Sequence, residues 1–140
     1  MKIKVTRVSL SGCDVGDGWI PFNNHCYKLF HVMRTWSAAK THCVSLGSLL
    51  AAIHSRKEND FVRTLISSPA WLGGNDIVSD GTWVWEDGAQ WGGFTSWRSA
   101  EPNGGDYEQC LVMRYDLSGE WNDAPCNNEK DYVCKMDGLK

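Results

Sequence analysis

The pattern of apolar and polar positions along this chain changes twice, and each change predicts a different kind of element. Near the start, aromatic residues precede two turn-forming asparagines, Asn23 and Asn24, and an apolar-rich segment follows at residues 26–30. Apolar segments on both sides of a short polar turn are typical of a β-hairpin. We therefore expect a hairpin over residues 13–30.

Two segments after this hairpin have apolar residues spaced as on one face of an amphipathic helix. The first follows Thr35, a favourable N-cap, and stops at Gly47. The second begins with a capping box formed by Ser55 and Glu58, and we expect it to end at Pro69. The apolar positions are Trp36, Ala39, Cys43 and Leu46 in the first helix, and Phe61, Val62, Leu65 and Ile66 in the second.

From residue 70 onward, alternating apolar positions and turn residues replace the helical spacing. The strand candidates are residues 71–76, 82–86, 110–115, 119–122 and 132–135, and a short apolar run at 48–53 is also strand-like. Helices followed by small antiparallel strands predict an α+β fold. The stretch from residue 88 to 103 has neither the helical spacing nor the alternation of a strand, and a loop of this length is usually functional. Its aromatic residues, Trp91, Phe94 and Trp97, favour an ordered loop.

Length and charge narrow the functional classes. A chain of 140 residues is long enough for one hydrophobic core and too short for two. The net charge of −3 does not suit a nucleic-acid partner, which requires a basic surface. No apolar run reaches the length of about 18 residues that a membrane span needs. We expect one domain that binds no nucleic acid and does not span a membrane.

The six cysteines are an even number in a short chain, which predicts disulfides and an oxidising compartment. We therefore expect a secreted or extracellular protein. Cys13 and Cys26 are natural partners across the predicted hairpin turn, and a bond between Cys110 and Cys126 would join the ends of a polar segment. Sequence alone does not choose among the possible pairings.

The first twelve residues form an extension ahead of the expected domain, which covers residues 13–136 and leaves a tail at 137–140. The extension has no apolar run of signal-peptide length. Ile3, Val5, Val8 and Leu10 form a weak strand pattern. We expect an edge strand, a pairing surface for a second copy of the chain, or sequence added for expression.

Candidate chemistry is concentrated in residues 101–123, which begin with E-P-N and end with W-N-D. This segment contains three candidate carboxylates, Glu101, Glu108 and Asp123, and two side-chain amides, Asn103 and Asn122. Oxygen ligands without clustered histidines or free thiols suit calcium rather than zinc or copper. The segment therefore predicts a calcium site.

The order of these elements and motifs resembles the C-type lectin-like domain family, in the long form that has an N-terminal hairpin. The resemblance runs from residue 13 to about residue 135. It rests on W-L-G-G-N-D at 71–76, G-T-W-V-W-E-D-G at 81–88, E-P-N at 101–103, W-N-D at 121–123 and the positions of the six cysteines. It implies an α+β fold in which two helices flank small antiparallel sheets beside a long loop region. The implied disulfides are Cys13–Cys26, Cys43–Cys134 and Cys110–Cys126.

The resemblance also implies how the site is built. A cis peptide bond before Pro102 would turn Glu101 and Asn103 to the same side, so that both side chains reach one Ca²⁺ ion. The implied ligands of this ion are Glu101, Asn103, Glu108, Asn122 and Asp123. Calcium takes six to eight oxygens, which leaves positions for two vicinal hydroxyls of a sugar. The same five residues, together with Tyr107, would contact the sugar.

Sugar preference follows from the E-P-N sequence in this family. E-P-N resembles the mannose-type pattern, which suits mannose, glucose, N-acetylglucosamine or fucose. Galactose-type relatives have Q-P-D and an aromatic ring that stacks on the sugar, and this chain lacks Q-P-D. Tyr107, Trp91 and Trp97 are candidates for such stacking, so galactose binding stays an alternative, although each ring is also a core candidate.

A second calcium position depends on Asp76 and Asp80, which match acidic positions of an auxiliary site in many relatives. Gly104 and Gln109 stand where those relatives place further ligands, and Asp106 is a candidate substitute. A plain turn role for Asp76 and Asp80 is an equal alternative.

Two other functional classes compete with sugar binding. Glycosidases also use paired carboxylates, but Glu101 and Glu108 are both expected as metal ligands. The four histidines, His25, His31, His42 and His54, form no catalytic motif, so we expect no enzyme activity. Many members of this family bind proteins without calcium, but these usually lack part of the ligand set. We expect a calcium-dependent lectin whose partners are glycans, with clustering of several copies for avidity.

Overall fold

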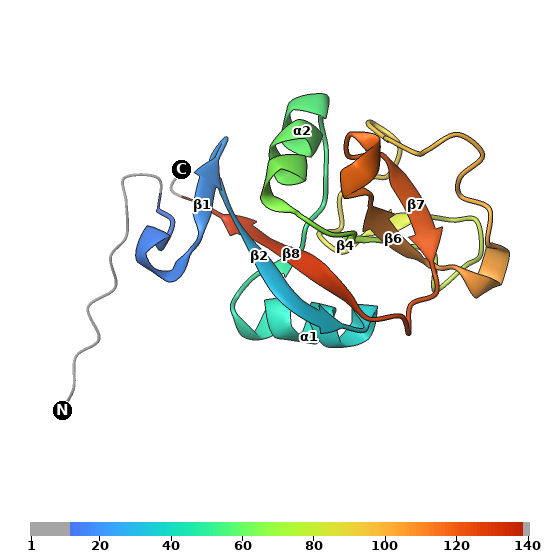
Figure 1. Ribbon diagram of the computed structural model, residues 1–140, viewed down its shortest axis with the longest axis horizontal. Coiled ribbons are helices and arrows are strands. Elements are labelled where there is room, and N and C mark those ends of the chain that lie inside the picture. Colours follow the sequence, from blue (N-terminus) through green and yellow to red (C-terminus); the bar gives the residue numbers. More distant parts are fainter. Residues whose placement is uncertain (1–11, 139–140) are drawn as a thin grey trace.

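The computed structural model describes residues 12–138, except for the side chain of Leu117. Eight strands form one sheet, and two helices lie on either side of its long central ribbon in the view of Figure 1. The helices are α1 (Trp36–Ser45) and α2 (Arg56–Leu65), with short 3-10 turns η1 (Val15–Asp17), η2 (Gly105–Tyr107) and η3 (Tyr115–Leu117). The strands are β1 (Ile20–Phe22), β2 (His25–Arg34), β3 (Leu49–Leu50), β4 (Ala70–Asn75), β5 (Val84–Trp85), β6 (Cys110–Met113), β7 (Trp121–Ala124) and β8 (Lys130–Asp137).

The sheet is mixed. Its strand order is β1-β2-β8-β4-β6-β7, with β3 paired to β8 and β5 paired to β4. Most pairs are antiparallel, but β4 and β8 run parallel, with Ala70 opposite Asp131 and Trp71 opposite Tyr132. The prediction of antiparallel sheets was therefore incomplete. Parallel neighbours need a long connection rather than a hairpin, and the segment between β4 and β8, which contains the long loop, supplies it.

The N-terminal hairpin is confirmed. Asn23 and Asn24 have φ angles of 48° and 69°, so both central residues of the two-residue turn are left-handed. Such turns match the twist of the flanking strands, and asparagine tolerates this conformation well. The weak strand pattern of residues 3–10 lies outside the described residues. At the other end, β8 continues to Asp137, one residue beyond the expected domain boundary.

Both helices begin at the predicted caps. Thr35 accepts a hydrogen bond from the backbone N–H of Ala38 at 3.3 Å, and Ser55 accepts one from Glu58 at 3.1 Å. Both side chains of the capping box accept from a backbone N–H as predicted, and the Glu58 carboxylate accepts from the N–H of His54, the residue before the cap. The prediction that α2 ends at Pro69 was wrong by several residues: α2 ends at Leu65, and the buried Ile66 is already extended.

Three disulfides tie the elements together, in the pairing that the resemblance implies. They join Cys13 to Cys26, Cys43 to Cys134, and Cys110 to Cys126, so all six cysteines are paired. Cys43–Cys134 connects α1 to β8. Cys110–Cys126 connects the start of β6 to the turn after β7. None of the helices in the described part of the chain is long and apolar enough to cross a membrane.

The long loop between β5 and β6 is ordered by aromatic packing rather than by regular structure. Its tryptophans pack on Trp121 of β7, in a cluster whose ring centroids lie 4.6 to 6.1 Å apart. The cluster comprises Trp83, Trp85, Trp91, Trp97 and Trp121. Backbone hydrogen bonds from Trp121 to Ser96 and from Arg98 to Trp121, both 2.8 Å, fix the loop along β7. This packing carries the chain to residue 101, beside Asn122 and Asp123.

Candidate metal centre

Three segments contribute the predicted ligands. The end of the long loop carries Glu101 and Asn103, η2 leads into Glu108, and β7 carries Asn122 and Asp123. The peptide bond between Glu101 and Pro102 is cis. Ala124 of β7 pairs with Cys110 of β6, so the segment after η2 lies directly beside the β7 ligands. The predicted residues, which span more than twenty positions in sequence, are therefore neighbours in space.

Asp123 is the anchor of the site. Its side chain is buried, with 2% of the residue exposed. One carboxylate oxygen accepts from the N–H of Asn103 at 3.2 Å, and the other accepts from the N–H of Gly104 at 3.0 Å. These two backbone N–H groups satisfy both oxygens of the buried carboxylate. Asp123 thus fastens the loop that carries Glu101 to strand β7.

Two other ligand candidates have a buried oxygen without a hydrogen-bond partner. These oxygens are Oε2 of Glu101 and Oδ1 of Asn122. The Asn122 side chain is oriented by its Nδ2, which donates to the backbone carbonyl of Asp123 at 2.9 Å. Leaving a buried polar atom unpaired costs about 1–3 kcal/mol, so such atoms require an explanation. A hard cation would satisfy both oxygens, and the donor set therefore fits calcium.

The carboxylates of the site are close enough to perturb one another. Burial, together with close approach to the Asp123 carboxylate and the charge of Glu108, raises the pKa of Glu101 to about 7. Burial, followed by the charge of Asp123, also raises the pKa of Glu108. Like charges that share a site favour protonation of one member, whereas a bound cation favours the charged forms. The three acids thus form one electrostatic unit.

Sequence reasoning named Gly104 only as a departure from the auxiliary calcium site and missed its contact with Glu108. A Cβ atom at this position would lie 2.2 Å from Cβ and 2.3 Å from Cγ and Oε1 of Glu108. The backbone of Gly104 has φ −92°, which any residue adopts, so the need for glycine comes from contact with Glu108 alone. No local sequence signal reveals this contact, because it depends on how the turn at η2 folds the chain back.

The described residues also set limits on the centre. In residues 12–138, no group of three or more His, Cys, Asp or Glu side chains converges closely enough to hold a metal by itself. Asn103 has an exposed side chain, and the backbone N–H groups of Asn103 and Gly104 occupy the oxygens of Asp123. Any coordination sphere therefore depends on the amides Asn103 and Asn122 as well as on the acids.

The predicted auxiliary residues lie beside the same site. Asp76 is buried, and its Oδ2 accepts from the N–H of Gly81 at 2.8 Å, which is the predicted turn role. Its Oδ1 is buried and has no partner. Burial raises the pKa of Asp76, and the charges of Asp80 and Asp123 add to this effect, whereas the Gly81 hydrogen bond opposes it. Asp80 is exposed.

The aromatic candidates separate clearly. Trp91 and Trp97 pack against the hydrophobic core, so they are structural rings. Tyr107 is 84% exposed in η2, directly before Glu108. Of the three aromatic residues considered for stacking, only Tyr107 presents an open ring next to the ligand candidates.

The mixed sheet, the two helices, the long loop packed on β7 and the three disulfides define a C-type lectin-like domain. The family model of the lectin C-type domain matches residues 32–136, and the chain belongs to this family. Ladderlectin of Oncorhynchus mykiss is 36% identical over 118 residues, which are 79% of this chain and 62% of the relative. The chain therefore spans less than two thirds of the length of Ladderlectin.

Other similar proteins have names that describe different activities. The alpha-N-acetylgalactosamine-specific lectin of Patiria pectinifera is 36% identical over 132 residues, with coverage of 84% of this chain and 77% of the relative. The crystal structure of a calcium-independent type II antifreeze protein superposes with a TM-score of 0.84 at 27% identity. That superposition covers 87% of this chain and 93% of the antifreeze protein. Membership of the family thus establishes the fold. The ligand has to be inferred from the residues of the site.

Proposed function

We propose that this protein binds carbohydrate through a calcium ion held by Glu101, Asn103, Glu108, Asn122 and Asp123. The observation that carries the proposal is the pair of buried, unpartnered oxygens on Glu101 and Asn122 beside the Asp123 carboxylate. These are hard oxygen donors in a cluster of mutually repelling acids, which is the environment that calcium stabilises.

The bound calcium would supply coordination positions for two vicinal sugar hydroxyls. The protein residues would select and orient those hydroxyls. A carboxylate such as Glu101 or Glu108 accepts the hydroxyl proton, while the amide of Asn103 or Asn122 donates to the hydroxyl oxygen. The fixed orientation of Asn122, set by its bond to the Asp123 carbonyl, supports this arrangement. The site binds and orients its ligand and carries out no reaction.

Mannose-type sugars are the proposed ligand class, on the strength of the E-P-N sequence at 101–103. Galactose-type sugars are a second candidate, favoured by the 84% exposure of Tyr107, whose ring is free to stack on the apolar face of a sugar. Similarity to a lectin named for α-N-acetylgalactosamine also supports this candidate. The proposed biological partners are glycans on secreted or cell-surface glycoproteins, and the three disulfides fit an extracellular setting. Auxiliary calcium binding at Asp76 and Asp80 is proposed as a weaker second site.

The main rival is binding that does not need calcium, either to a protein or to a surface such as ice. The superposition on a calcium-independent antifreeze protein favours this rival. The two proposals differ in one measurable respect, since chelation should abolish sugar binding and leave calcium-independent binding intact.

The decisive experiment is retention on immobilised mannose with calcium, followed by elution with EDTA and by competition with mannose and galactose. We expect retention, complete elution by EDTA, and stronger competition by mannose. Retention that survives EDTA contradicts the proposal, and stronger competition by galactose selects the second candidate. The variant Asn103→Asp should change the ranking of the two sugars while the folded protein is retained. Asn127→Asp, an exposed asparagine in the turn after β7, is the matched control and should change nothing.

A further inference from the structure

A second concave site is lined by elements other than those that carry the metal centre. A pocket of about 770 Å³ opens between the β1–β2 hairpin, the C-terminal end of β8 and the start of α2. In Figure 1 β1 and the C-terminal end of β8 lie to the left and α2 lies near the middle, whereas β6 and β7 lie to the right. The volume falls in the range of about 300–1,000 Å³ that is usual for small-molecule sites.

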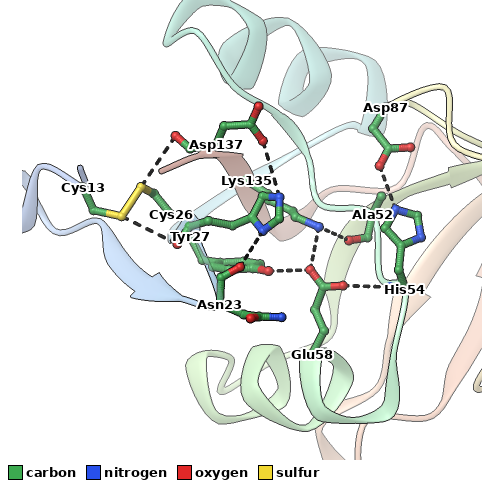
Figure 2. A network of polar contacts seen from close by, with 11 residues as sticks. Cys13, Asn23, Cys26, Tyr27, Ala52, His54, Glu58, Asp87, Lys135 and Asp137 are labelled. Atoms are coloured by element: carbon green, nitrogen blue, oxygen red, sulfur yellow. Dashed lines mark hydrogen bonds and ion pairs between the residues drawn. A yellow bond between two sulfur atoms is a disulfide. The ribbon is translucent and has the colours of Figure 1, made fainter. Parts of the chain in front are cut away.

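The floor of the pocket is a satisfied ion pair. Lys135 Nζ lies 2.6 Å from Oε2 of Glu58, and both side chains are nearly fully buried. The hydroxyl of Tyr27 donates to the same oxygen, the N–H of His54 donates to the other at 2.7 Å, and Lys135 also donates to the carbonyl of Ala52 (Figure 2). Although burial acts to raise the pKa of Glu58, the hydrogen bonds from Lys135 and Tyr27 lower it. The floor of the pocket is therefore held rigidly, and its two charges cancel.

The rim of the pocket carries two carboxylates, each beside an imidazole ring. His54 Nε2 lies 2.7 Å from Oδ2 of Asp87, and His25 Nε2 lies 3.4 Å from Oδ1 of Asp137. Figure 2 shows these two aspartates on either side of the Glu58–Lys135 pair. In the described part of the chain, neither aspartate forms an ion pair with a lysine or an arginine. Asp87 is the less exposed of the two, so its charge is the less screened.

The walls between floor and rim are apolar and partly aromatic. Phe22 and Tyr27 meet edge to face with their ring centroids 6.4 Å apart. Leu49, Leu50 and Met136 complete this surface. Apolar walls bind a hydrophobic body. The Lys135 ammonium already lies 5.7 Å from the centroid of the Tyr27 ring, and Phe22 is stacked on Phe61. The rim carboxylates therefore supply the recognition of charge, and the wall supplies the apolar contact.

We propose that this pocket binds a small organic cation, namely an amine carried on an aromatic or aliphatic body. The apolar body packs on Phe22, Leu49 and Met136, which are partly exposed apolar side chains of the lining, and the ammonium group pairs with the Asp87 carboxylate at the rim. Neutral molecules lack the charge partner, and anions are repelled by both aspartates. This site is independent of the calcium-dependent function and of its ligand.

Tryptamine is a suitable probe. Tryptophol is the neutral control and indole-3-propionate is the anionic control, and both carry the same indole ring. Each compound is titrated into the full calcium-loaded chain at pH 7.5 and followed by amide chemical shifts in two-dimensional NMR. We expect tryptamine to bind at least tenfold more tightly than either control. The shifts should cluster at residues 22–27, 48–55, 87 and 135–137. Equal binding of all three compounds, or shifts spread over the whole surface, overturns the proposal.

Variants of the rim aspartates distinguish recognition of the ammonium charge from nonspecific hydrophobic binding. Asp87→Asn should weaken tryptamine binding at least fivefold, and Asp137→Asn should weaken it by a smaller factor. Asp60→Asn, on the exposed face of α2, is the matched control and should leave the affinity unchanged. Since Asp137 has a largely exposed side chain, its variant remains informative even if Asp87→Asn does not fold. Unchanged affinity in both rim variants, or tryptamine displacement by mannose, contradicts the proposal.

Discussion

Asp123 shows how one buried side chain can organise a binding loop. Its two oxygens accept from successive backbone N–H groups of the loop, and its carbonyl orients the amide of Asn122. Its charge also contributes to the raised pKa of Glu101 and of Glu108. The Asp123 carboxylate thus holds the loop in position and also repels the carboxylates of Glu101 and Glu108. A cation in the site would relieve that repulsion.

Gly104 gives the first prediction at this scale. In Gly104→Ala the new methyl group would overlap Cβ and Cγ of Glu108, so Glu108 must leave its present position. We expect calcium affinity to fall by about ten- to a hundredfold, which is usual when a positioning contact around a metal ligand is lost. Isothermal titration with calcium measures this change, and thermal unfolding in EDTA should show little loss of stability.

Gly93→Ala is the matched control, because a Cβ at Gly93 meets nothing within 4 Å. If both variants bind calcium as the unmodified protein does, Glu108 is not a ligand.

Glu101 gives a pH prediction. Its pKa is raised to about 7, and calcium needs the deprotonated carboxylate, so protons compete with the ion near neutral pH. We expect calcium affinity to fall about tenfold between about pH 8 and about pH 6, where one group of pKa 7 becomes protonated. Isothermal titration over this range measures the slope.

Glu101→Gln tests the assignment of that slope. The amide keeps the shape of the side chain and cannot titrate, so affinity should be lower and nearly independent of pH over the same range. A slope that persists unchanged in the variant would assign the titration to another group.

At the scale of elements, Asn59 joins α2 to the strand that carries the site. It is fully buried, its Nδ2 donates to the carbonyl of Gly119 at 3.0 Å, and its Oδ1 accepts from Nε1 of Trp121 at 2.8 Å. Trp121 directly precedes the ligand candidates Asn122 and Asp123. The position of α2 and the position of the site are therefore linked through one amide.

Asn59→Ala would leave both partners buried and unpaired. At about 1–3 kcal/mol for each of the two groups, we expect a loss of about 2–6 kcal/mol in the free energy of unfolding. Urea denaturation measures it, with Asp60→Ala on the exposed side of the same helix as control. A loss below about 0.5 kcal/mol, the range of ordinary surface changes, would mean that water replaces the amide.

Elements with a local chemical signal were predictable, and those that depend on distant packing were not. The turn at Asn23 and Asn24 and the caps Thr35 and Ser55 are local, and all appear as predicted. The end of α2 was misplaced because burial of Ile66 overrides the signal of Pro69.

The strand predicted at residues 82–86 is reduced to Val84–Trp85, since most of its neighbours pack as loop around the tryptophan cluster. The parallel pairing of β4 and β8 likewise has no signature within either strand. In the site, the oxygen donors of residues 101–123 supplied the ligand candidates, and the resemblance implied how they share one ion. The contact of Gly104 with Glu108 and the unpaired oxygens required three-dimensional packing.

At the scale of the whole molecule, the disulfides differ in what they constrain. Cys43 and Cys134 are 91 residues apart, whereas Cys110 and Cys126 are 16 apart. By chain entropy, the long closure stabilises by about 4–5 kcal/mol and the short one by about 3 kcal/mol. We expect the double variant Cys43→Ser/Cys134→Ser to lose more stability in urea than Cys110→Ser/Cys126→Ser.

Calcium affinity should rank these two variants differently. The short bridge holds β6 to the turn after β7, so its loss should weaken calcium binding while the variant still folds. The prediction fails if calcium affinity is unchanged without the Cys110–Cys126 bridge.

The tryptophan cluster has a spectroscopic consequence. Five indole rings packed edge to face or tilted against one another couple their electronic transitions. Such coupling produces circular dichroism in the near ultraviolet only while the rings keep a fixed geometry. Most of these chromophores belong to the β5 strand and the long loop, and Trp121 belongs to the ligand strand. The near-ultraviolet band therefore monitors the order of the loop, while the far-ultraviolet band monitors the sheet and helices. The molecule thus contains an optical probe for the order of the long loop.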